Sequence, residues 1–401
     1  IIPLQYVCNF VAPLKPKVDG YIKHESFFDS RQVDAFGDGE ALLWPLDKQL
    51  ASCGNDTNAQ PQFNMIPIET RVRIEFCGPK VGSAQSTMVI ESDFFGPTDP
   101  LSLLTIVNIM QMRHAFFTLD WEDTSLMVGQ YWHPLIVPTC YPNTISYNSG
   151  LPFEPFAQCP QLRVTHHSRY ISYIAAALMQ LNSPSAGPIG LSTTYERNAI
   201  VPNIHVQAYA HAADHLFGLA LDYKLLRPQL VTDTDFKEHA VIGSVATAVY
   251  MGLKFGQWTI NTKALYGQNM TDFSMMGGYA VHTIEPVTHK HTYTNLGVLA
   301  WWADVYCTKE RYEPGLFVGA SKNLGALETI HPELPNTIFA LGQNIDTVMR
   351  ISPRIRYFFS NEFPLSLEAE YTSAAYGTIT PNGTVGCTHS VGNARLLLAL
   401  Y

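Results

Sequence analysis

Between residues 68 and 76 the chain alternates between apolar and charged side chains. The even positions are Ile68, Thr70, Val72, Ile74 and Phe76, and the odd positions are Glu69, Arg71, Arg73 and Glu75. Successive side chains of a β-strand point to opposite faces, so this segment is predicted to be a strand with one apolar and one charged face. A helix would not sort the residues in this way, and a buried parallel strand would not tolerate the charges. Either a soluble sheet packed on a core or a membrane barrel with lipid on its apolar side fits this pattern.

Similar alternating segments follow along the chain, and they are joined by connections of two different lengths. Tight turns such as 213–214 and 256–257 join some neighbours, whereas connections such as 134–160 and 269–292 are more than twenty residues long. Short periplasmic turns and long extracellular loops are typical of outer-membrane barrels. The segments predict an all-β fold, a transmembrane antiparallel β-barrel of about 16 strands, within a range of 14–18 because segment ends are uncertain.

The two ends of the chain add to this prediction. Residues 391–401 alternate again, with Leu396 and Leu398 on one side and Arg395 on the other, and they end in Tyr401. A terminal strand that ends in an aromatic residue resembles the signal by which outer-membrane barrels are recognised for assembly. The proline-containing residues 1–16 are interpreted as an extended lead-in to a single barrel domain at 17–401. Because residues 1–10 lack an initiating Met and a basic leader, they resemble the start of a mature, cleaved chain.

Composition favours a membrane protein that crosses with strands. Charged residues make up 15% of the chain, against roughly 25% in an average soluble protein. The longest apolar runs, such as 174–179, are far shorter than the roughly 20 residues that a membrane helix needs. The net charge is −9 and the 25 Lys and Arg residues are dispersed, so nucleic acid is not an expected partner. The expected partners are outer-membrane lipids, small hydrophilic solutes, and a second copy or another outer-membrane protein.

The seven cysteines show no CxxC spacing, which argues against a structural zinc site. Because their number is odd, at least one thiol is left unpaired within the chain. Cys140 and Cys159 flank one long loop. A bridge between these two cysteines and two separate thiols are both compatible with the sequence.

Several longer runs are similar to a known family. They are FFDSRQ at 27–32, RHAFFTLDW at 113–121, LMVGQYWHP at 126–134, GLPFEPF at 150–156, LDYKLLRPQLVTD at 221–233, YGQNMTDFSMMGGYAV at 266–281, GLFVGASKNLG at 315–325 and LEAEYTSAAYGT at 367–378. Together they resemble a family of porin-like outer-membrane β-barrel proteins from the Bacteroidetes group, over nearly the whole chain. The resemblance implies a β-barrel in the bacterial outer membrane and implies little about mechanism. Members usually continue past the final Leu-rich run, so we expect a short C-terminal trim, and they have fewer cysteines.

Charged side chains on the polar faces of the predicted strands are the candidate pore-lining residues. In a barrel of about 16 strands the interior is a water-filled channel, where charges of both signs create a field that sorts solutes. The same charges could instead only neutralise one another and stiffen the wall. The candidates are Lys23, Glu25, Glu69, Arg71, Arg73, Glu75, Glu91, Asp93, Arg350, Arg354, Arg356, Glu368, Glu370 and Arg395.

The long connection at 134–160 is the first candidate for the constriction of the pore. It contains six prolines and several aromatic residues, and loops of this length in a compact domain are usually functional. We expect it to fold into the barrel. The tryptophans Trp121, Trp132, Trp258, Trp301 and Trp302 lie near predicted strand ends, where aromatic residues form interface girdles.

No cofactor, metal site or enzymatic activity is expected. His211 and His215 flank a turn, His282, His289 and His291 lie with Glu285 in a loop, and His166 and His167 point to opposite faces of one strand. Solvated histidines explain these groups without a metal. The chain has no GxSxG, HExxH or Walker motif. A barrel hydrolase that uses Asp120, His114 and Ser125 near a tight turn is a weaker alternative.

The function that the sequence predicts is that of an outer-membrane porin-like channel for passive diffusion of small hydrophilic solutes. An alternative is a barrel plugged by its own loops that acts as a scaffold or accessory subunit of a larger outer-membrane assembly. A soluble all-β binding protein is a third hypothesis.

Overall fold

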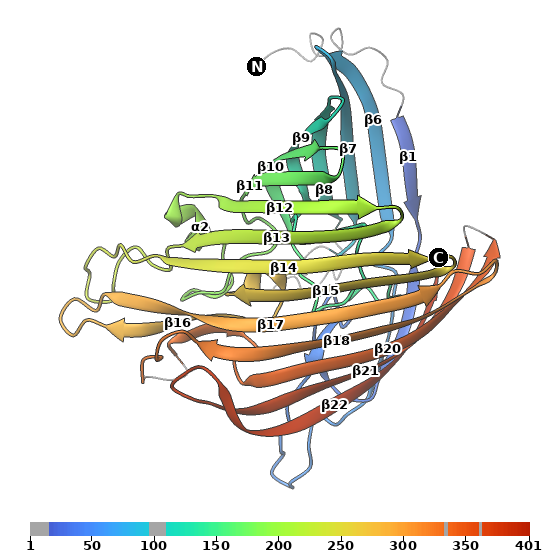
Figure 1. The fold of residues 1–401 in the computed structure, drawn as a ribbon. Helices are drawn as coiled ribbons and strands as arrows, with labels where there is room; N and C mark the ends of the chain where they lie inside the picture. Colours follow the sequence, from blue (N-terminus) through green and yellow to red (C-terminus); the bar gives the residue numbers. More distant parts are fainter. Residues whose placement is uncertain (1–15, 96–109, 333–335, 361–362) are drawn as a thin grey trace.

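The computed structural model describes residues 16–95, 110–332, 336–360 and 363–401, which form a strongly curved antiparallel sheet (Figure 1). The strands of the first half are β1 (Pro16–Tyr21), β2 (His24–Asp29), β3 (Val33–Phe36), β4 (Ala41–Pro45), β5 (Gln62–Ile66), β6 (Arg71–Val81), β7 (Ala84–Asp93), β8 (Gln111–Asp120), β9 (Thr124–Trp132), β10 (Gln158–His167) and β11 (Ile171–Leu178). The expected lead-in at 1–16 lies, except for Pro16, outside the described residues.

The second half continues the same meander. Its strands are β12 (Asn203–Ala212), β13 (His215–Leu226), β14 (Ile242–Phe255), β15 (Trp258–Gln268), β16 (Gly277–Ile284), β17 (His291–Cys307), β18 (Tyr312–Ala326), β19 (Ile338–Leu341), β20 (Ile345–Ser360), β21 (Phe363–Ile379) and β22 (Val385–Leu400). A short helix, α2 (Thr194–Ala199), and a 3₁₀ turn, η1 (Thr271–Phe273), lie in the connections. None of the described helices is long and apolar enough to cross a membrane.

The first and last strands of the chain meet in the same sheet. β2 pairs with β22 on one side and with β5 on the other, while β1 pairs with β6. β1 and β2 are two parts of one strand that is interrupted at residues 22–23, and β5 and β6 are likewise interrupted at residues 67–70. From β6 the sheet runs through antiparallel neighbours to β22.

The described residues form 22 strands, more than the 14–18 that the sequence predicts. The two interruptions each divide one long strand into two. The β3–β4 hairpin forms a separate two-stranded sheet. The short strand β16 pairs with the first part of β17, and the short strand β19 pairs with β16. The prediction of an all-β antiparallel fold is confirmed. The additional strands arise where a long strand is interrupted or where a connecting segment forms a short strand, and a count of alternating segments does not detect either feature.

The outer face of the sheet is apolar, as the alternation predicts. In β22 the side chain of Leu396 is 52% exposed and that of the next residue, Leu397, is 1% exposed. Val72 in β6 and Leu219 in β13 are exposed in the same way. Ile68 is an exception, because it lies in the interruption between β5 and β6 and is buried.

Short turns and long connections lie at opposite ends of the sheet, as predicted. The turns β12–β13 and β14–β15 and the chain end at β22 lie at one end, and α2 and the long connections lie at the other (Figure 1). The tryptophan prediction is wrong in two cases. Trp302 is fully buried in the interior cluster and Trp132 packs edge-on against Phe156, because neighbouring residues of a strand face opposite sides.

We expect Leu396→Arg to destabilise the fold in a lipid bilayer by about 2–4 kcal/mol, the cost of an arginine near the bilayer midplane. Leu396 lies on the outer face of β22, well inside the strand. Leu400→Arg, at the end of the same strand, is the matched control and should cost about 0–1 kcal/mol. Urea unfolding in phospholipid vesicles measures both values. An equal loss of unfolding free energy in the two variants would contradict the interpretation that lipid covers this face of the sheet.

Candidate functional site

The connection at 133–157 enters the interior of the sheet, as the sequence predicts, and is fixed there by buried polar contacts. Glu154 is its main anchor. The carboxylate accepts hydrogen bonds from Lys263 Nζ at 2.5 Å and from Trp302 Nε1 at 2.7 Å. Lys263 also donates to the carbonyl of Leu135 at 2.8 Å. Because Lys263 is in β15 and Trp302 in β17, one side of the wall holds both ends of this inward loop.

The middle of the inward loop contacts the opposite part of the wall. The backbone N–H of Ile145 donates to Glu368 at 2.6 Å, and Lys23 donates to the carbonyl of Ile145 at 2.7 Å. Asn148 donates to Glu370 at 2.7 Å. These partners belong to β21 and to the break between β1 and β2. They lie beside the junction at which β22 pairs with β2, which we call the seam. The inward loop therefore crosses the interior from β15 to the seam.

The β3–β4 hairpin is a second segment inside the sheet. Every residue of β4 is buried. Arg350 donates to the carbonyls of Leu42 at 3.0 Å and Leu43 at 3.2 Å, and Arg395 donates to the carbonyl of Glu40 at 3.0 Å. These arginines therefore donate to backbone carbonyls of the hairpin and hold it against the inner face of the sheet.

Residues 269–276, which include η1, form a third inward segment. Lys224 Nζ in β13 donates to Asp272 at 2.5 Å and to the carbonyl of Asn269 at 2.6 Å. The N–H of Phe156 donates to the carbonyl of Phe273 at 3.0 Å. This contact connects the third segment to the inward loop 133–157.

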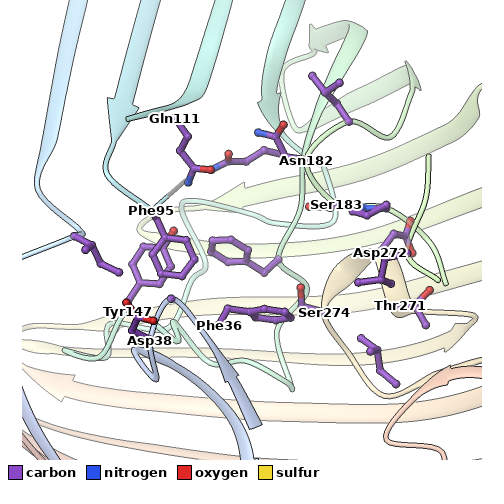
Figure 2. Close-up of a pocket in the computed structure, with 18 of the residues that line it drawn as sticks. Phe36, Asp38, Phe95, Gln111, Tyr147, Asn182, Ser183, Thr271, Asp272 and Ser274 are labelled. Carbon is purple, nitrogen blue, oxygen red and sulfur yellow. The ribbon is translucent and has the colours of Figure 1, made fainter. Parts of the chain in front are cut away.

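A cavity of about 560 Å³ lies between these segments (Figure 2). One wall is aromatic, and within it the rings of Phe95 and Tyr147 stack with centroids 4.5 Å apart. Gln111, Asn182, Ser183 and Asp272 contribute polar groups to the lining. A solute in this cavity would meet apolar ring faces on one side and hydrogen-bonding groups on the other.

The candidate pore-lining charges are all at least partly shielded from solvent. Ten of the fourteen are buried: Lys23, Glu25, Glu69, Glu91, Asp93, Arg350, Arg354, Glu368, Glu370 and Arg395. The other four, Arg71, Arg73, Glu75 and Arg356, are half-buried. Most of the buried charges have a partner of opposite sign.

The ion pairs of the buried arginines show how completely they are neutralised. Arg354 makes two contacts with Asp304, at 2.7 and 2.9 Å. Arg350 lies 3.2 Å from Glu370, and Arg395 lies 2.8 Å from Asp29. Two contacts to one carboxylate fix the orientation of both groups.

Arg113 is a central interior residue that the sequence analysis missed. It is fully buried and contacts Glu91 at 3.1 Å, Asp93 at 2.5 Å and the hydroxyl of Tyr147 at 2.9 Å. The strand alternation placed it opposite His114, yet both side chains are buried. Arg113 is the extra residue of a β-bulge, and a bulge shifts the alternation of the strand.

Asp304, Lys263 and Glu154 were also missed, for different reasons. Lys263 follows Asn261 on alternate positions of β15, and this weak polar alternation was the available signal. Asp304 shares the inward face of β17 with Trp302 and Ala300, so the alternation in the sequence does not identify this face as polar. Glu154 lies in a loop, where no periodicity indicates direction.

Glu40 lies in the turn of the β3–β4 hairpin and close to two other carboxylates. Carboxylate oxygens of Glu25, Glu40 and Glu69 lie within 4.8 Å of one another, and Lys23 Nζ lies 2.9 Å from Glu25. Burial raises the pKa of Glu40 well above its usual range, and the neighbouring Glu25 carboxylate raises it further. Docking of the hairpin therefore shifts the protonation equilibrium of Glu40 toward the protonated form, relative to the free side chain.

The residues of the hydrolase alternative do not form a catalytic triad. Ser125 donates to Asp120 at 2.5 Å. His114 is six positions from Asp120 in β8, roughly 20 Å along an extended strand, and it lies near Glu91.

The three loop histidines at 282, 289 and 291 have separate partners. His289 contacts Asp233, His282 contacts the carbonyl of Thr329, and His291 contacts Gln229. The six cysteines that the structure describes, Cys140 and Cys159 among them, are unbridged.

The sequence matches no family model and no curated protein. Solved structures, however, share its fold. The outer membrane channel DcaP of Acinetobacter baumannii matches with a TM-score of 0.67 at 14% identity, over 98% of each chain. An anion-selective porin from Comamonas acidovorans matches with a TM-score of 0.58 at 6% identity, over 97% of this chain and 99% of that chain. A trimer form of OmpT, an outer membrane protein of Vibrio cholerae, matches with a TM-score of 0.52 at 11% identity, over 96% and 99%.

These similarities show that the chain has the β-barrel fold of outer-membrane porins. Each match extends over nearly the whole length of both chains.

Removal of Glu154 alone should be much more harmful than removal of its whole ion pair. Glu154→Leu leaves Lys263 buried and unpaired, and we expect a loss of about 3–5 kcal/mol in the free energy of unfolding. The double variant Glu154→Leu/Lys263→Met should recover most of this loss, because it leaves no buried charge. Equilibrium unfolding in detergent measures both. Equal losses in the single and double variants would contradict the importance of this pair.

The docking of the hairpin should weaken as the pH rises. The pKa of Glu40 is higher in the folded protein than in the unfolded chain, so its contribution to stability is fully present below the unfolded pKa of about 4.3. That contribution is lost as the pH rises through the folded pKa, by up to about 1.4 kcal/mol per pH unit. The protection of the backbone amides of residues 33–45 against hydrogen exchange, followed between pH 5 and 9, measures the stability of the docked hairpin. Glu40→Gln should abolish the dependence, whereas Glu122→Gln in an exposed turn should not.

Proposed function

We propose that this chain is an integral protein of the bacterial outer membrane and forms a channel for passive diffusion of small hydrophilic solutes. The cavity between the inward segments carries this proposal, because it offers polar groups inside a wall whose outer face is apolar. The fold shared with an outer membrane channel and an anion-selective porin supports it.

In this proposal the inward loop 133–157 forms the constriction. Its anchors lie on β15, β17 and β21 and at the seam, so it narrows the interior over most of its width. Solutes pass between its aromatic residues and the polar lining contributed by Asn182 and Ser183.

Among the candidate pore-lining charges, we assign solute sorting to the half-buried ones. The side chains of Arg73 and Glu75 are 34% and 35% exposed, so water and ions reach them. Arg350 and Arg354, by contrast, are buried and paired. Their role in this proposal is to hold the inward segments against the wall.

A plugged barrel that serves as a scaffold is the second candidate. Three inward segments share one buried apolar cluster, which includes Trp44, Phe153, Phe273 and Trp302. Such a cluster resists displacement, since its residues would have to leave a packed core. A barrel filled in this way conducts little unless a segment moves.

The remaining proposals concern enzymatic activity, partners and origin. We propose that the protein is not an enzyme, since Ser125, Asp120 and His114 do not converge. Outer-membrane lipids cover the apolar face, and a homo-oligomer is supported by the trimer form of OmpT. The runs at 113–121 and 266–281 support membership of the Bacteroidetes porin-like family. We also retain the proposal that residues 17–401 form one domain.

Deletion of residues 143–156 should raise the single-channel conductance in planar bilayers severalfold, because it removes the segment that crosses the interior. Deletion of residues 48–57, in an exposed loop, is the matched control and should leave the conductance unchanged. Sodium dodecyl sulfate gel mobility without heating confirms that each variant is folded.

Two results would decide against the channel with this constriction. An unchanged conductance in the folded deletion variant would show that the inward loop does not limit the pore. Persistent silence of the folded parent protein, together with a stable partner in mild detergent, would favour the plugged scaffold.

A further inference from the structure

Three buried side chains converge at the base of the inward loop. His133 follows β9 where the loop begins, His205 is in β12 and Asp222 is in β13, and all three are almost fully buried. His133 Nε2 and His205 Nδ1 each lie 3.2 Å from the same oxygen, Asp222 Oδ1. The three ligand atoms lie within 4.8 Å of one another.

The two separations of 3.2 Å suit a tetrahedral metal ion. Ligand atoms about 2.0–2.1 Å from a tetrahedral zinc ion lie about 3.3 Å from one another. A charge-assisted hydrogen bond to a carboxylate is usually shorter, at about 2.7–2.9 Å. The Nε2 atom of His133 has no well-oriented hydrogen bond despite its burial. The two imidazole rings are nearly perpendicular, with an interplanar angle of 88°, so two edges converge on Asp222 from different directions.

The surroundings of His205 also match those of a metal ligand. Its second nitrogen, Nε2, lies 3.2 Å from Gln207 Oε1, and Gln207 Nε2 lies 2.5 Å from the hydroxyl of Tyr250. Metal-binding histidines usually donate their other ring N–H to such an oriented acceptor, which fixes the tautomer and the ring plane. Gln207 is therefore a positioning residue for His205.

We propose that His133, His205 and Asp222 bind a divalent transition-metal ion of the zinc class, with water completing the coordination. Two imidazoles and one carboxylate suit such ions. The N–H of Leu135 donates to His133 Nδ1, so the ring proton of the free form lies on Nε2. The metal replaces that proton, which passes to water.

The site would join the inward loop to the wall. His133 belongs to the loop, whereas His205 and Asp222 belong to neighbouring strands that pair directly with each other. A bound metal therefore fixes the first residue of the loop to β12 and β13. This inference does not depend on whether solutes pass through the barrel.

The test uses the full chain, refolded in detergent and stripped with a chelator that is then removed. Titration with CoCl₂ should give one saturable equivalent with the intense visible absorption of four-coordinate cobalt, and ZnCl₂ should displace it. His205→Ala should weaken cobalt binding by more than about 100-fold, and Gln207→Ala by about 10–100-fold, the usual effect of an outer partner. His211→Ala, in the same strand but exposed, is the matched control and should bind normally.

The proposal is overturned if the folded parent protein shows no saturable cobalt binding, since the three residues would then form only a hydrogen-bonded cluster. It is also overturned if Gln207→Ala and Asp222→Asn bind cobalt as tightly as the parent, because the metal would then be held by other histidines. If His205→Ala does not fold, the cobalt affinities of Gln207→Ala and Asp222→Asn decide whether the metal binds at this site.

Discussion

The structure depends on one constraint, which is that a single-layer sheet with an apolar outer face must place its polar side chains inside. Except at bulges, every second residue of a strand points inward, and a buried charge is costly unless it is paired. The interior is therefore organised as pairs. Arg354 with Asp304 and Lys263 with Glu154 are examples in which both members are buried.

The inward segments are part of this pairing. Backbone carbonyls in loops need donors, and the wall supplies them through Lys23, Arg350 and Arg395. Wall carboxylates such as Glu368 accept from backbone N–H groups of the loop in return. The wall charges therefore serve two purposes, because the same groups that make the interior polar also determine which loops can enter it.

The sequence predicted the wall well and the interior less well. Alternation in 391–401 located an outward face that the structure confirms at Leu396 and Leu398, because strand periodicity is a local property. The length and aromatic content of 134–160 indicated an inward loop. No local signal indicated that Glu154 would meet Lys263 or that His133 would meet Asp222, since these contacts join segments about 90 or more residues apart. The bulge at Arg113 shifted the alternation within a single strand.

The pairing of β2 with β22 has a consequence for how the chain folds. Residues near the start of the sheet, such as His24, are hydrogen-bonded neighbours of Leu400. A contact between such distant parts of a chain carries a large loop-closure entropy, so it forms late. Until it forms, β22 and the first strand each expose an unpaired edge that can join another chain. The period before this seam is made is therefore when the protein is most prone to aggregation, and chaperoning of the nascent barrel would matter most then.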